Sequence, residues 1–123
     1  MNLEERDRTD LFALLALVAT HGFGDGLTTG YALALHESLA FERNELIRRL
    51  LSAVMLEGLP YAIHAPSPWA VLGVGFLVGK VLLAGVVSFL LWRLREHAPR
   101  WRLWVALLVG AGIYVTVTNA LLL

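Results

Sequence analysis

Three long apolar runs dominate the chain, separated by short segments rich in polar residues. The runs cover residues 11–35, 69–92 and 101–123. An α-helix rises about 1.5 Å per residue, so each run can cross the roughly 30 Å hydrocarbon core of a lipid bilayer. The pattern therefore predicts an all-α integral membrane protein with three transmembrane helices, which form a single membrane domain over residues 1–123.

The segment at residues 45–58 shows a different pattern. Apolar residues recur at three- and four-residue intervals from Leu46 to Met55, and charged residues occupy the other side. This period is typical of an amphipathic helix, whose first turn Asn44 can cap, and its charges favour a position in the membrane interface. The alternative is that residues 46–64 cross the bilayer, which would give four transmembrane helices.

The ten residues before the first run are polar and mix four acidic residues with two arginines. This composition differs from the basic start of a signal peptide, so we interpret the first run as a retained transmembrane helix. Asp10 immediately precedes the run. Its carboxylate is therefore expected to cap the first helix.

Composition narrows the classes of partner. Hydrophobic residues make up 58% of the chain, and the formal net charge is zero. A neutral, apolar chain has no excess of basic residues with which to bind nucleic acid. We therefore expect the protein to lie in a lipid bilayer and to bind no nucleic acid. The chain has no cysteine, which excludes disulfides and cysteine-based metal sites.

Two opposite charges lie inside the predicted transmembrane helices. Asp25 lies near the middle of the first run, and Lys80, the only lysine, lies near the middle of the second. A charge at the bilayer centre costs about 2.5 to 3.5 kcal/mol on insertion scales, and an opposite charge at the same depth offsets much of that cost. We therefore predict an intramembrane ion pair. It can be a structural pair that fixes helix register, or a protonatable, ion-binding site.

Other polar residues are expected near this pair. His21, Thr28 and Thr29 lie on the same helical face as Asp25, and Asn119 lies late in the third run. Each also has a structural explanation, since threonine hydroxyls can bond to carbonyls of the preceding turn. The candidate polar core, or ion and proton site, consists of Asp25, Lys80, His21, Thr28, Thr29 and Asn119, with Glu42 and Asn44 above it.

Glycines recur at four-residue spacing in the first two predicted transmembrane helices. Gly22, Gly26 and Gly30 form one stripe, and Gly75 and Gly79 form another. Such stripes let helices approach closely in a bilayer. Because three helices bury few polar groups by themselves, we expect a homo-oligomer or a subunit of a larger membrane complex.

The polar residues form a spaced pattern over most of the chain. The pattern reads Asp25-x-x-Thr28-Thr29, then Glu42-x-Asn44, then Lys80 and Asn119. It resembles a family of small archaeal and bacterial membrane proteins known as a domain of unknown function. The resemblance implies membrane location and a shared polar core, and it implies no particular activity.

The motifs of common enzymes are missing from the chain. It contains no hydrolase elbow, phosphate-binding loop or HExxH motif, and no metal-ligand spacing occurs near Asp25. We therefore expect no catalytic residues, no metal and no cofactor. The sequence favours a structural or accessory membrane subunit or homo-oligomer. The alternative is a small proton- or cation-coupled transporter or channel that uses Asp25 and Lys80.

Sidedness is predicted from the basic residues between the second and third runs. Residues 93–102 hold four arginines. In a chain with three transmembrane helices, this turn and the N-terminus lie on the same side of the membrane. Because basic loops stay on the cytoplasmic side, we expect a multi-pass protein of the cell membrane with a cytoplasmic N-terminus.

Overall fold

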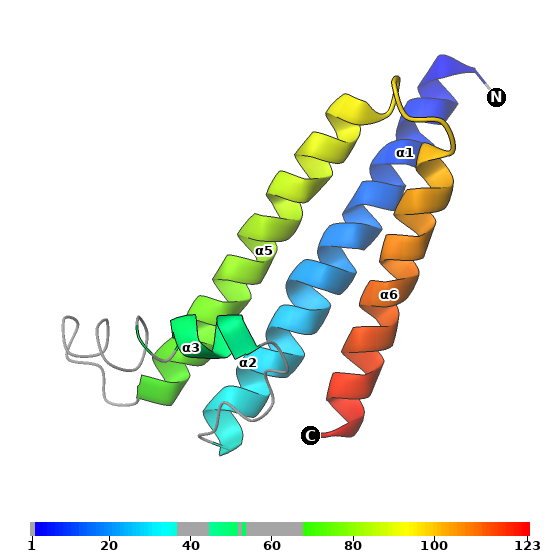
Figure 1. Ribbon diagram of the computed structural model, residues 1–123. Helices are drawn as coiled ribbons and strands as arrows, with labels where there is room; N and C mark the ends of the chain where they lie inside the picture. The colour runs from blue at the N-terminus through cyan, green and yellow to red at the C-terminus, as the bar shows by residue number, and fades with distance from the viewer. Residues whose placement is uncertain (1, 37–44, 52, 54–67) are drawn as a thin grey trace.

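The computed structural model describes residues 2–36, 45–51, 53 and 68–123. Within these ranges the chain is helical and contains no strand. Three helices are long and apolar enough to cross a membrane, as Figure 1 shows. This confirms the prediction of an all-α protein of the membrane type with three long apolar helices.

The first helix is continuous over Leu3–His36 and changes its winding in the middle. It consists of the α-helix α1 (Leu3–Leu17), a π-helical segment η1 (Val18–Gly24) and the α-helix α2 (Asp25–His36). Its N-terminal end lies earlier in the sequence than we predicted.

The start of α1 corrects the expected role of Asp10. Asn2 is the N-cap, and its side-chain oxygen accepts a hydrogen bond of 2.8 Å from the backbone N–H of Glu5. The Glu5 carboxylate accepts one of 3.3 Å from the backbone N–H of Asn2. This reciprocal capping box satisfies two of the free N–H groups that a helix start leaves. Asp10 therefore lies inside the helix, and the prediction that it caps the helix is wrong.

The second and third long helices are α5 (Pro68–Leu94) and α6 (Trp101–Leu121). They are joined by a short turn, which lies at the same end of the bundle as the N-terminus, whereas the C-terminus lies at the opposite end (Figure 1). The three long helices thus run up and down beside one another.

A short helix, α3 (Glu45–Leu51), covers the first part of the predicted amphipathic helix. Figure 1 shows it lying across the first part of α5, and Ile47 packs against an apolar cluster that contains Leu33 and Leu72. The rest of that predicted helix, apart from residue 53, lies outside the described residues. So does most of 46–64, the alternative fourth transmembrane segment.

The glycine stripe of the first helix packs against α5 within the same chain. A Cβ at Gly30 would lie 2.6 Å from the carbonyl oxygen of Gly73, closer than real Cβ atoms come to backbone. A Cβ at Gly26 would lie 3.0 Å from a methyl carbon of Leu77, and Gly22 likewise contacts Val81. The small residues therefore let two backbones touch, as glycine stripes do in membranes.

The expected second stripe is not the partner of the first. The close contact on α5 is made by Gly73, and a Cβ at Gly79 would meet nothing within 4 Å in the described parts of the chain. Gly75 is half-buried. Gly79 faces outwards because the helix turns it away from α2, so it takes no part in packing among the described residues.

Candidate functional site

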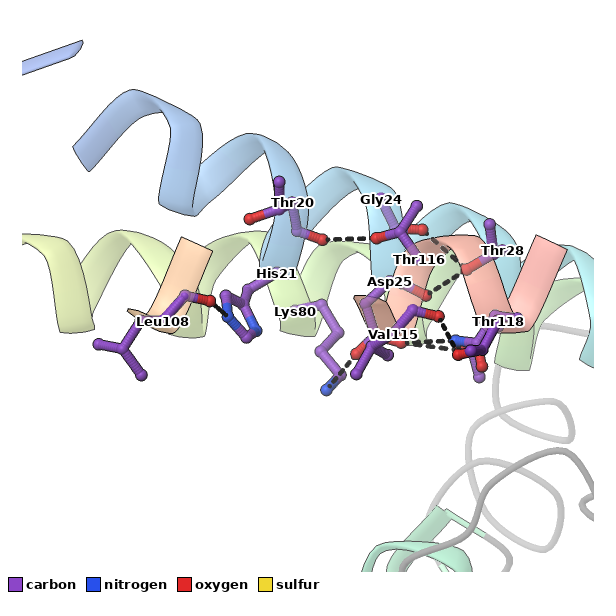
Figure 2. Close-up of polar contacts among 12 residues, drawn as sticks. Thr20, His21, Gly24, Asp25, Thr28, Lys80, Leu108, Val115, Thr116 and Thr118 are labelled. Carbon is purple, nitrogen blue, oxygen red and sulfur yellow. Dashed lines mark hydrogen bonds and ion pairs between the residues drawn. The ribbon is translucent and has the colours of Figure 1, made fainter. Parts of the chain in front are cut away.

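Asp25 lies at the junction between η1 and α2, and groups from three helices meet at its carboxylate. The Lys80 Nζ atom of α5 lies 2.7 Å from Oδ2. Oδ1 accepts a 3.1 Å hydrogen bond from the Thr29 hydroxyl and a 2.9 Å bond from the Asn119 side-chain amide of α6. Figure 2 shows Lys80 pointing towards Asp25. We call Asp25, Thr29, Lys80 and Asn119 the Asp25 network.

The hydrogen bonds of the network are consistent in direction. The Thr29 hydroxyl donates to Asp25 and accepts a 3.1 Å bond from Asn119, whose amide also donates to Asp25. Both carboxylate oxygens are thereby bound, and Thr29 and Asp25 are buried. A buried carboxylate is tolerated when its oxygens are paired in this way, because the bonds replace those lost to water.

Lys80 is less enclosed than its partner. Its side chain is 27% exposed against 11% for Asp25, and its Nζ lies 5.4 Å from the centre of the Phe76 ring. Gly26 makes room for it, since a Cβ there would lie 3.3 Å from the Lys80 Cβ. The lysine thus reaches Asp25 across the glycine contact, with an aromatic face beside its charge.

The π-helical segment explains how α6 reaches the network. The Thr20 carbonyl accepts from the Asp25 backbone N–H and also from the Thr116 hydroxyl of α6, at 3.1 Å. Thr116 comes this close because position 24 is glycine: a Cβ there would overlap the Thr116 side chain. π-Helical turns are rare and are frequent at functional sites. Here the turn is tied to the third helix just before Asp25 (Figure 2).

His21 lies in the π-helical segment and contacts α6 instead of Asp25. Its Nε2 lies 2.6 Å from the carbonyl oxygen of Leu108. Because a carbonyl oxygen only accepts, Nε2 carries the proton and donates. The approach depends on Gly112, where a Cβ would lie 2.8 Å from the His21 ring. His21 is therefore held by α6 (Figure 2).

A small cavity separates His21 from Lys80. Its volume is about 150 Å³, and most of its lining is apolar. His21 and Lys80 are the only ionisable residues in that lining. The cavity is lined by Leu17, His21, Lys80, Leu83, Ala84, Val87 and Leu108.

Among the remaining predicted site residues, the structure describes only Thr28, which is not in the network. The Thr28 hydroxyl donates to the carbonyl of Gly24 at 2.8 Å, which is a bond within its own helix. Glu42 and Asn44 lie outside the described residues. Among the residues that the structure describes, no group of three His, Asp or Glu side chains is placed to hold a metal ion.

The sequence analysis did not predict that a second carboxylate, that of Asp10, is buried and forms ion pairs. Asp10 is 2% exposed, and its Oδ1 lies 2.9 Å from Nε of Arg102 while its Oδ2 lies 3.4 Å from Nη1 of Arg95. We call these three residues the Asp10 cluster. The spacing could have indicated these ion pairs. Asp10 precedes Asp25 by as many residues as Arg95 follows Lys80, and the first helix and α5 are antiparallel, so Arg95 is expected beside Asp10 if Lys80 lies beside Asp25.

The close contacts of α6 were also missed. Asn119 marks one helical face. Stepping back along it by three or four residues leads to Thr116 and Gly112, and two further steps lead to the buried Val105. These are the residues that meet the first helix. The face could have been found by starting from the polar residue that a membrane helix must bury.

The chain matches no family model, no curated protein and no solved structure. The resemblance to a domain of unknown function therefore stays a prediction. The role of the site has to be inferred from its geometry.

Proposed function

We propose that the protein is a multi-pass structural subunit of the cell membrane, in which the Asp25 network fixes the register of three transmembrane helices. One observation carries the proposal: a single carboxylate binds groups from α2, α5 and α6. A carboxylate with both oxygens already bound is suited to holding helices together. The same saturation leaves little capacity for a further cation.

The outer faces of α5 and α6 support a role in assembly. Large apolar side chains such as Leu82 and Trp104 are exposed there, and Gly79 has open space around it. Lipid is as apolar as these side chains, so exposed area alone does not drive helix association, whereas a glycine allows the close approach that does. We propose that a second copy or a partner subunit packs over Gly79.

The register role is tested by a double-mutant cycle with Asp25→Asn and Lys80→Met. Each single change leaves a charged group inside the bundle without its opposite charge and is expected to lower the free energy of unfolding by about 3 to 5 kcal/mol. The double variant leaves no unpaired charge, so its loss should be well below the sum of the two. Reversible unfolding in mixed micelles measures all three. Independent, additive losses contradict the proposal.

Assembly is tested by the mass of the protein extracted into lipid nanodiscs. We expect more than one copy, or one copy with a co-purifying subunit, and Gly79→Leu should reduce that species. Gly110→Leu tests the outer face of α6 in the same way, because Gly110 is equally open there, and it should leave that species unchanged when the contact lies over Gly79. A lone monomer in every preparation would overturn the assembly proposal.

A second candidate function is proton transport, and the cavity between His21 and Lys80 favours it. The cavity brings an imidazole and an ammonium group to one small space beside Asp25. Ionisable groups inside membranes often mark proton paths. A proton leaving the Asp25–Lys80 pair could pass to His21 across this space.

Flux measurements in proteoliposomes separate the two candidates. A transporter acidifies vesicles that contain a pH-sensitive dye, under an imposed potential, and His21→Gln should abolish that flux. Asp10→Asn serves as a control carboxylate outside the Asp25 network. Vesicles no leakier than protein-free ones would eliminate transport and leave the structural role intact.

We propose a cytoplasmic N-terminus, supported by the four arginines of residues 93–102 at the same end of the bundle. The natural chain has no cysteine, so single cysteines report sidedness cleanly. In intact cells, an impermeant thiol reagent should label Leu123→Cys and spare His97→Cys. The reverse labelling would contradict the orientation.

A further inference from the structure

A second pocket, distinct from the Asp25 network, lies at the end of the bundle that holds the N-terminus and the turn after α5. Its volume is about 330 Å³. The charged residues in its lining are four arginines and one aspartate: Arg6, Arg95, Arg100, Arg102 and Asp10. The linings of two other pockets among the described residues are mostly apolar, so this concentration of guanidinium groups sets the pocket apart.

Two of these arginines are held in place by carboxylates. Arg95 pairs with Asp7 at 2.9 Å, with Asp10 at 3.4 Å and with Glu96 at 3.4 Å, so its charge is already compensated. Arg102 bonds to Asp10 through Nε only, at 2.9 Å. The buried Asp10 therefore orients both guanidinium groups, and Arg102 keeps its two Nη nitrogens without a partner among the described residues.

The other two arginines have free donors. Arg6 makes only a long ion pair of 3.9 Å, with Glu96, and Arg100 has no bonded side-chain partner within the described ranges. Arg100 also has a φ of 61°, a left-handed conformation that is unfavourable for a residue with a Cβ. No side chain caps the start of α6 at this residue. Helix N-termini attract anions, and strained backbone is frequent at ligand sites.

We propose that this pocket binds the phosphate of an anionic phospholipid headgroup. Guanidinium groups bind phosphate oxygens through paired N–H donors, and here the free donors belong to Arg6, Arg100 and Arg102. Because Asp10 already orients Arg102, little ordering is lost on binding.

The position of the pocket selects a lipid over free phosphate. All three long helices end here, and Trp92 and Trp104 lie near these ends, as indole rings do at the membrane interface. Headgroup phosphates occupy this depth of the bilayer at high local concentration, whereas free phosphate has to bind from bulk water.

Lipid retention by the full chain tests the proposal. The protein is purified in detergent micelles doped with phosphatidylglycerol, phosphatidic acid or phosphatidylcholine, and bound lipid is counted by native mass spectrometry. We expect one anionic lipid to be retained about tenfold more strongly than phosphatidylcholine, since charge-assisted bonds carry the preference. Equal retention of all three lipids overturns the proposal.

Variants distinguish a built site from general attraction between charges. Arg100→Gln should weaken retention of the anionic lipid about tenfold, whereas Arg93→Gln should change it less than about twofold. Arg93 is exposed, lies at the same end of the bundle and does not line the pocket. Equal losses in the two variants would mean diffuse attraction and overturn the proposal.

Two further arms complete the test. Arg100→Gly removes the guanidinium and relieves the left-handed conformation, so it should lose lipid while the protein unfolds no more easily. If Arg100→Gly keeps its lipid, the residue has no part in binding and the proposal fails.

Inorganic phosphate alone, added to lipid-free micelles, is expected not to protect the protein against unfolding. Protection as strong as that given by the anionic lipid would assign the pocket to free phosphate.

Discussion

The Asp25 network and the Asp10 cluster are two versions of one arrangement. In each, a buried aspartate on the first helix lies between a cation from the second helix, or the turn just after it, and a donor from the third. The partners are Lys80 and Asn119 for Asp25, and Arg95 and Arg102 for Asp10. The spacing matches: fifteen residues separate Asp10 from Asp25, and fifteen separate Lys80 from Arg95. About 22 Å of helix therefore lies between two levels at which the same helices are joined.

The two levels differ in what surrounds the charges. At the middle of the bundle, Asp25 is bound by one lysine and two neutral donors, and no other ion pair involving these residues is seen in the described chain. At the end, Arg102 is 46% exposed and Arg95 pairs with three carboxylates. When one cation is lost at the end, Asp10 keeps the other, whereas Lys80 is the only cation paired with Asp25 in the described chain. The loss of one partner should therefore cost more at Asp25 than at Asp10.

Removing one cation from each level is the strongest test of this difference. Lys80→Met leaves the Asp25 carboxylate without an opposite charge, bound only by the neutral donors Thr29 and Asn119, and should lower the free energy of unfolding by about 3 to 5 kcal/mol. Arg102→Met leaves Asp10 with Arg95 and should cost about 1 kcal/mol. Both variants replace a cation by methionine, and reversible unfolding in mixed micelles measures the free energy of unfolding of each. Equal costs would mean that water reaches both levels alike.

The contact of α6 with the π-helical segment is the next largest effect. In Gly112→Ala the new Cβ would lie 2.5 Å from the Thr20 hydroxyl and 2.8 Å from the Thr20 Cβ, so α6 must move away. The expected loss is about 1 to 3 kcal/mol, as for other overpacked contacts. Gly110→Ala is the control two residues earlier, where a Cβ meets nothing within 4 Å, and it should cause no loss. If Gly112→Ala does not lower the free energy of unfolding, α6 is not closely packed against the π-helical segment.

Most of the fold follows from the sequence, because a run of more than twenty apolar residues has one stable environment. The long helices α5 and α6 begin and end within about two residues of the predicted runs, within the usual uncertainty of helix ends. The start of the first helix was missed because its first two turns are polar and carry no hydrophobic signal. Only the capping residues Asn2 and Glu5 mark that start.

The candidate site is only partly predictable, for a physical reason. Asp25 and Lys80 are each costly alone in a bilayer, so their contact follows from depth and charge. The π-helical segment, by contrast, depends on Gly24 and Thr116 fitting together, and no periodicity in one helix encodes a fit between two. Arg95 and Arg102 were interpreted only as a sidedness signal, which left Asp10 without its partners.

Two neighbouring threonines test the network with a smaller effect. Thr29→Val keeps the side-chain shape and removes the hydroxyl between Asp25 and Asn119, so it should cost about 1 kcal/mol. Thr28→Val removes a hydroxyl that bonds only to carbonyls of its own helix, and it should change stability by less than about 0.5 kcal/mol. The same unfolding measurement shows which of the two variants loses more stability. A larger loss for Thr28→Val would place the important hydroxyl outside the network.

The smallest expected effect is that of salt on the ion-pair coupling energies at the two levels. Dissolved ions screen charges in water over about 10 Å at 0.1 M and about 3 Å at 1 M, but they do not enter the hydrocarbon region. The coupling energy between Asp10 and Arg102, from a cycle of Asp10→Asn and Arg102→Met, should therefore fall by about 0.5 kcal/mol between these concentrations. The coupling between Asp25 and Lys80 should not change, since no counterion can replace either partner there. If both couplings fall together, salt water reaches Asp25, and the middle of the bundle is a hydrated path instead of a dry joint.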